Sequence, residues 1–140
     1  MPKDIRILVA EDNDGDFDLM MEYLEEDEIP FHIDRARNGE EVLPLLETIE
    51  QLPNIVLLDI NMPRMSGLEV LHKLKLSEKY KHIPIAIFTS SEAHRDVDSA
   101  KEGNANGYMV KPAEIHLEDL AAFIAYAELH PEDFVELKPN

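Results

Sequence analysis

The stretch "NIVLLDINMPRMSG" (residues 54–67) decides the fold of this chain. Four consecutive apolar residues, 55–58, lead directly into an acid, Asp59, and turn-forming residues follow it. A short apolar run bounded by turn residues is typical of a strand that is buried on both faces of a sheet. We therefore predict a central strand that holds the carboxylate of Asp59 at its carboxyl end.

On either side of this strand, two periodicities alternate along the chain. Short β-branched or aromatic runs predict strands, and apolar residues at i, i+3, i+4 and i+7 predict helices between them. The predicted strands are 5–10, 31–36, 54–58, 83–88 and 107–110. The predicted helices are 17–24, 42–49, 67–77, 92–103 and 117–124. This order predicts an α/β domain with a five-stranded parallel sheet covered on both faces, with 31–36 as an edge strand because polar residues interrupt it.

Composition limits the kind of protein and its partners. The chain has 140 residues, 44% of them hydrophobic, a formal net charge of -17 and no cysteine. This length suits one domain with its own core. Nucleic acid and anionic membranes are not expected as partners, because both are negatively charged themselves. With no apolar run long enough to span a membrane and no signal-peptide pattern, we expect a cytoplasmic protein.

Charged and polar residues follow four of the predicted strands. Glu11 and Asp12 follow the first strand, Asp59 the third, Thr89 the fourth and Lys111 the fifth. We expect these residues to meet at one rim, because ligands in such sheets bind outside the carboxyl ends of the strands. Crowded carboxylates repel one another, so at least one pKa should rise unless a cation such as Mg²⁺ joins them. A carboxylate beside Mg²⁺ can attack phosphorus and form an aspartyl-phosphate, which Lys111 and Thr89 would stabilise.

At these residues the sequence resembles the receiver domains of two-component response regulators, which are bacterial signalling switches. The motifs "VAEDN" (9–13), "LLDINMPRMSG" (57–67), "IFTSS" (87–91) and "GYMVKP" (107–112) match this family in order and spacing. The resemblance runs from about residue 4 to about residue 127. It implies a flavodoxin-like, doubly wound (βα)5 fold with the strand order 2-1-3-4-5.

The resemblance also implies a role for each residue at the rim. Asp59 would be the phosphoacceptor, and Lys111 would contact the phosphoryl group. Mg²⁺ or Mn²⁺ would be bound by Asp12, Asp59 and the backbone carbonyl of Asn61. Glu11 stands where many members have aspartate, so we expect it to reach the metal through a water molecule.

The family further implies a conformational switch. Thr89 would move toward the phosphoryl group, and Tyr108, three residues before Lys111, would follow it inward. The peptide bond before Pro112 would be cis. In this family the positions of Asn61 and Ser91 tune how fast the phosphoryl group is hydrolysed.

We predict a receiver domain over 1–127 and a short C-terminal tail over 128–140, with no effector domain. Output would then pass through a protein target, after a sensor histidine kinase or a histidine phosphotransfer protein has supplied the phosphoryl group. The predicted contact face consists of 92–103, 107–110 and 117–124, because 92–103 has the thinnest apolar stripe. A homodimer through this face is compatible with the sequence. The chain is also similar to the single-domain regulators that partner bacterial phytochromes and related sensor kinases.

Other interpretations stay open. Asp14 and Asp16 are predicted to start and cap the first helix, whose N-terminal dipole favours acids, rather than to bind metal. A phosphatase of the haloacid dehalogenase type would need a second aspartate two residues after Asp59, where this chain has Asn61, which cannot transfer a proton. A receiver-like scaffold that is never phosphorylated would be expected to have lost site residues. We expect no enzyme beyond Mg²⁺-dependent phosphorylation and autodephosphorylation of the chain itself.

Overall fold

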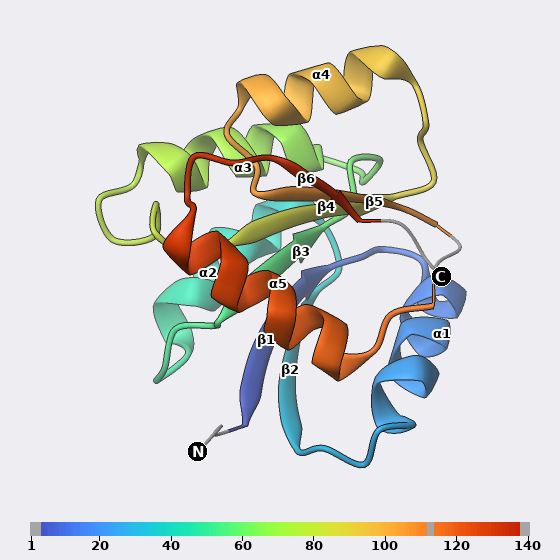
Figure 1. Ribbon diagram of the computed structural model, residues 1–140. Coiled ribbons are helices and arrows are strands. Elements are labelled where there is room, and N and C mark those ends of the chain that lie inside the picture. The colour runs from blue at the N-terminus through green and yellow to red at the C-terminus, as the bar shows by residue number, and fades with distance from the viewer. Residues whose placement is uncertain (1–3, 112–113, 138–140) are drawn as a thin grey trace.

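Every predicted strand forms, and neighbouring strands pair in parallel (Figure 1). The computed structural model describes residues 4–111 and 114–137. Its strands are β1 (Ile5–Ala10), β2 (Phe31–Ala36), β3 (Ile55–Leu58), β4 (Ile85–Thr89), β5 (Gly107–Val110) and β6 (Val135–Leu137). Their order in the sheet is β2-β1-β3-β4-β5-β6. The flavodoxin-like order 2-1-3-4-5 is thereby confirmed, and a sixth strand is added to it.

Helices cover both faces of this sheet (Figure 1). They are α1 (Asp14–Glu25), α2 (Val42–Thr48), α3 (Gly67–Leu76), α4 (His94–Glu102) and α5 (Leu117–Leu129), and a 3-10 helix, η1 (Gly39–Glu41), precedes α2. One apolar cluster joins the sheet to α1 and α5, and the other joins it to α2, α3 and α4. Within the described residues, none of the helices combines the length and the apolar character needed to cross a membrane.

The central strand β3 is buried on both faces, as predicted. Ile55 and Leu57 pack in the cluster with α1 and α5, whereas Val56 and Leu58 pack in the cluster with α2, α3 and α4. The alternation follows from the period of two residues in a strand. Each buried aliphatic side chain of this kind contributes about 1.5–3 kcal/mol to folding. Asp59 therefore extends from one of the most firmly held segments of the molecule.

The C-terminal segment departs from the prediction of a five-stranded sheet and a tail over 128–140. Residues 128 and 129 continue α5, and 135–137 form β6, which pairs in parallel with β5. Val135 N donates to the carbonyl oxygen of Asn106 at 3.0 Å, and Val135 lies opposite Gly107 in the register. The outer edge of β5 is thus covered by the chain itself, so the predicted contact face lacks an open strand edge there.

The helix α4 is weakly attached, as its thin apolar stripe predicted. It is described over its whole length, and Ala100 is the one buried residue in it. Val97 packs only partly buried against the core. Few buried apolar contacts are typical of elements with low local stability.

Candidate functional site

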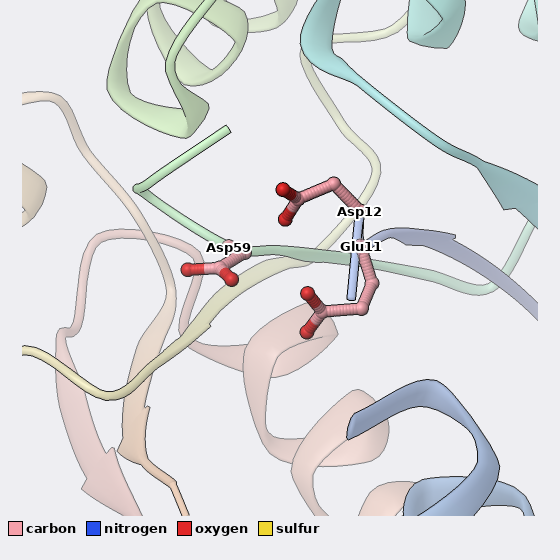
Figure 2. Close-up of side chains that lie close together, drawn as sticks. All are labelled: Glu11, Asp12 and Asp59. Atoms are coloured by element: carbon pink, nitrogen blue, oxygen red, sulfur yellow. The ribbon is translucent and has the colours of Figure 1, made fainter. Parts of the chain in front are cut away.

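The carboxyl ends of three strands bring four charged side chains to one rim of the sheet. Glu11 and Asp12 follow β1, Asp59 follows β3 and Lys111 follows β5. Figure 2 shows the three carboxylates near one another, and one oxygen from each lies within 4.8 Å of the other two. Glu11 is 1% exposed and Asp59 is 7% exposed, whereas Asp12 is exposed to solvent. The predicted meeting of these residues is confirmed.

The loop after β3 fixes the position of Asp59. The backbone N–H of Asp59 donates to the carbonyl of Ala10 at 3.1 Å, and Gly67 N donates to the carbonyl of Ile60 at 3.0 Å. A Cβ atom on Gly67 would lie 2.0 Å from the carbonyl oxygen of Asp59, so a side chain is excluded there. Asn61 N donates to Asp59 Oδ1 at 3.2 Å. The carboxylate is therefore held by its own loop as well as by β3.

The ammonium group of Lys111 is shared by three carboxylates. It donates to Glu11 Oε1, to Asp59 Oδ2 at 3.0 Å and to Asp16 Oδ2 at 3.0 Å. These bonds use all three N–H groups that a lysine ammonium has. Burial alone would lower the pKa of Lys111, but the hydrogen bonds that it donates to Glu11 and Asp59 outweigh this effect and raise that pKa. Lys111 therefore stays positively charged at neutral pH.

Asp16 is a residue of this site that sequence reasoning missed, because it was predicted to cap α1. The cap is Asn13, whose side chain accepts from Asp16 N at 2.8 Å. Asp14, the other acid in the first turn, pairs with Arg35 at 2.8 Å and with Arg37 at 2.9 Å. A signal was present in the sequence, since a helix that directly follows a strand of such a sheet begins at the same rim as the site.

The predicted switch residues lie beside the rim. Thr89, at the end of β4, is fully buried, and its carbonyl accepts from Lys111 N at 2.8 Å. Its hydroxyl accepts a long hydrogen bond from Ser91 N at 3.5 Å. Tyr108 is 2% exposed and its hydroxyl donates to the carbonyl of Ser91 at 3.0 Å. Ser91 thus links the two predicted switch residues, while Pro112 lies outside the described residues.

Comparison with known proteins identifies the family of this chain. Residues 7–125 match the response regulator receiver domain. The chain belongs to this family. Receiver domains are signalling switches, which agrees with a buried charged site whose parts come from many segments of the chain.

Relatives of this receiver include regulatory proteins and solved structures. The probable methanogenesis regulatory protein FilR2 of Methanothrix harundinacea is 35% identical over 118 residues, which are 81% of this chain and 75% of that protein. The phosphorylated cyanobacterial phytochrome response regulator RcpA matches with a TM-score of 0.74 and 26% identity over 93% of both chains. The Mn²⁺-bound form of response regulator Rcp1 matches with a TM-score of 0.71 and 30% identity, over 89% of this chain and 91% of that chain.

The acids of this receiver fit a hard divalent cation. Burial raises the pKa of Glu11, against the lowering effect of its hydrogen bond with Lys111, and the charge of Asp59 adds to the rise. One ammonium, that of Lys111, pairs with Glu11, Asp16 and Asp59, and Glu11 and Asp59 also lie close to the carboxylate of Asp12. Carboxylate and carbonyl oxygens are the ligands that Mg²⁺ prefers, and it keeps several waters in such sites. The donor set at the rim, with Asp12 open to solvent, is of this kind.

Proposed function

We propose that this receiver accepts a phosphoryl group on Asp59 from a histidine kinase or a histidine phosphotransfer protein, and that phosphorylation changes its contacts with other proteins. The observation that carries the proposal is the placement of Asp59. Its carboxylate lies at the end of buried β3, next to the carboxylates of Glu11 and Asp12 and 3.0 Å from the ammonium of Lys111.

In the transfer, a carboxylate oxygen of Asp59 attacks the phosphorus of a phosphohistidine. The new phosphorus–oxygen bond forms as the phosphorus–nitrogen bond breaks, and the histidine nitrogen keeps the electron pair and takes a proton from water. Asp12, Asp59 and the Asn61 carbonyl, with Glu11 through water, would hold Mg²⁺ or Mn²⁺. Such an ion, when bound, supplies positive charge that offsets the crowded negative oxygens. Lys111 donates to a phosphoryl oxygen, and water later cleaves the phosphorus–oxygen bond at the same site.

The signal would leave the site through Thr89 and Tyr108. A phosphoryl group adds roughly 1.5 to 2 negative charges with strong acceptor oxygens, which draw the Thr89 hydroxyl away from Ser91. The backbone carbonyl of Ser91 accepts from the Tyr108 hydroxyl, and the hydroxyl of Ser91 donates to Asp96 of α4. Because α4 buries so little, a small change at Ser91 shifts it readily.

Partners of the proposed switch follow from its surface and its relatives. We infer a cytoplasmic receiver domain over 1–127, a sensor kinase related to those of phytochrome response regulators as the donor, and a protein target. The net charge of -17 argues against nucleic acid and anionic membranes as partners. A homodimer through the α4, β5 and α5 face would use β6 as well, since β6 covers the edge of β5.

Mass spectrometry of the intact protein tests the proposal. Wild type is incubated with acetyl phosphate and Mg²⁺, or with acetyl phosphate and a chelator, beside Asp59→Asn. We expect one phosphoryl adduct on wild type that requires Mg²⁺, and none on Asp59→Asn, because the amide cannot form the acyl phosphate. Absence of an adduct with acetyl phosphate and also with a phosphohistidine donor would contradict the proposal and favour the unphosphorylated scaffold.

A further inference from the structure

Asp16 ties the first turn of α1 to the phosphorylation site. Its Oδ2 accepts from Lys111 Nζ at 3.0 Å, the same distance that separates this nitrogen from Asp59 Oδ2. With Glu11 as the third acceptor, the ammonium has no N–H group left to give. A phosphoryl oxygen that binds Lys111 must therefore take the place of Asp59 or displace Glu11 or Asp16.

The three acceptors differ in how readily they can be released. The side chains of Glu11 and Asp59 are 1% and 9% exposed, whereas that of Asp16 is 46% exposed. A carboxylate released into water is solvated again, while one left unpaired in the interior is strongly disfavoured. The N-terminus of α1 also stabilises an acid in its first turn without Lys111. Of the three, Asp16 is the acceptor that leaves at the lowest cost in free energy.

We propose that Asp16 is a positioning residue for Lys111 that competes with the phosphoryl group for its ammonium, so that phosphorylation of Asp59 releases Asp16. This inference rests on the proposed function of Asp59. Asp16 would then slow phosphorylation. The hydrogen bond between Lys111 and Asp16 must break before Lys111 can bind the incoming phosphoryl group, and this reduces the net stabilisation that Lys111 provides. Phosphorylation would then change the contacts of the first turn of α1 as well as those of α4.

Asp14 provides a matched control for Asp16. Both acids lie in the first turn of α1, but Asp14 pairs with Arg35 and Arg37 instead. Asp14→Asn and Asp16→Asn each remove one negative charge near the site without changing side-chain size. Only the second variant replaces a charged acceptor of Lys111 with a neutral amide, whose oxygen accepts more weakly.

The test combines two measurements on wild type and both variants. The ¹⁵N resonance and the hydrogen exchange of the Lys111 ammonium, assigned with Lys111→Arg, are recorded without any phosphodonor. The rate of phosphorylation by acetyl phosphate and Mg²⁺ is then followed by intact mass. We expect Asp16→Asn to shift the Lys111 signal, to speed its exchange, and to raise the phosphorylation rate about threefold or more above that of Asp14→Asn.

Each other outcome has a definite meaning. Equal increases of the phosphorylation rate in the two variants would show that net charge alone causes the effect, and would overturn the proposal. A slower rate in Asp16→Asn would overturn it as well. An unchanged Lys111 signal in Asp16→Asn would disprove the contact itself. If wild type takes up no phosphoryl group, the proposed function fails and the competition fails with it, while the Lys111 signal still decides whether Asp16 positions the ammonium.

Discussion

Asn106 shows how one buried side chain joins several parts of the molecule. Its Oδ1 accepts from Ile85 N at 2.9 Å and from Lys75 Nζ at 3.2 Å, and its Nδ2 donates to the carbonyl of Pro131 at 3.4 Å. Asn106 is 4% exposed, so water cannot readily replace these bonds. Burial lowers the pKa of Lys75, which makes the amide oxygen a needed partner for its charged form. One amide thus connects β4, α3 and the segment that leads to β6.

Asn106→Ala should lower the free energy of unfolding by about 2 kcal/mol, because it leaves the Ile85 N–H buried without an acceptor. Urea denaturation followed by circular dichroism measures the loss. Asn54→Ala is the matched control, since Asn54 Oδ1 accepts from Arg6 N at 2.8 Å in an exposed position. Water replaces that acceptor, so the control should lose clearly less. Equal losses would contradict the role of burial.

At the scale of elements, α1 and α5 meet through a small charged cluster. Asp27, just after α1, accepts from Leu117 N at 3.0 Å and so satisfies the start of α5. Among the described residues, His116 makes no side-chain cap for α5, and instead lies 3.6 Å from Asp27 and contacts Glu114. The hydrogen bond to Glu114 raises the pKa of His116, with the charges of Asp27 and Glu26 adding to it, against a smaller effect of burial.

This cluster makes stability depend on pH in one direction. Because the pKa of His116 is raised above its ordinary value of 6.5 in the folded state, protonation favours folding. The contribution is complete below that ordinary value and disappears as the pH rises through the raised one. The difference in unfolding free energy between wild type and His116→Gln should therefore shrink from about pH 5.5 to about pH 8.5. Denaturant titrations across this range measure it, and a difference that grows with pH would refute the assignment.

At the scale of the whole molecule, negative charge dominates. The formal net charge is -17, and three carboxylates of the site each have an oxygen within 4.8 Å of the other two. Such a surface repels itself in the folded state, and salt screens the repulsion over about 10 Å at 0.1 M. General screening acts on the whole surface, whereas a bound cation acts at the site alone.

These two effects can be separated by thermal unfolding at equal ionic strength. NaCl should raise Tm by screening, and MgCl₂ should raise it further, by about 5 °C when the free metal is about ten times its Kd. Asp12→Asn should keep the NaCl effect and lose most of the additional Mg²⁺ effect. If the variant retains the full difference between the two salts, Mg²⁺ stabilises the protein elsewhere.

Much of this architecture could be predicted because strong local patterns match the tertiary structure. The apolar run 55–58 and the helical stripes predicted the elements, and the rule for strand ends placed Glu11, Asp12, Asp59 and Lys111 at one rim. Element ends were less predictable: the apolar stripe of α5 was recognised over 117–124 and the domain was expected to end at 127, but α5 continues to Leu129. Helix ends depend on caps and contacts that periodicity does not encode.

Two features depended on tertiary contacts that no local pattern contains. The strand β6 has three residues, too few to show an alternation, and it forms because the edge of β5 is available beside it. Asp16 looks like any acid at a helix start, and only the approach of Lys111 from β5 makes it part of the site. Both were missed for the same physical reason, since a distant segment decides what the residue does.

Because β6 covers the edge of β5, this edge stays unpaired during synthesis until β6 has been made. β5 leaves the ribosome before α5 and β6, and at typical rates of translation the interval is roughly 1–5 s. During that interval the growing chain can fold its first strands while "GYMV" keeps an unpaired edge, the feature through which β proteins aggregate. Pairing of β6 with β5 therefore closes the edge through which a nascent receiver could pair with another chain.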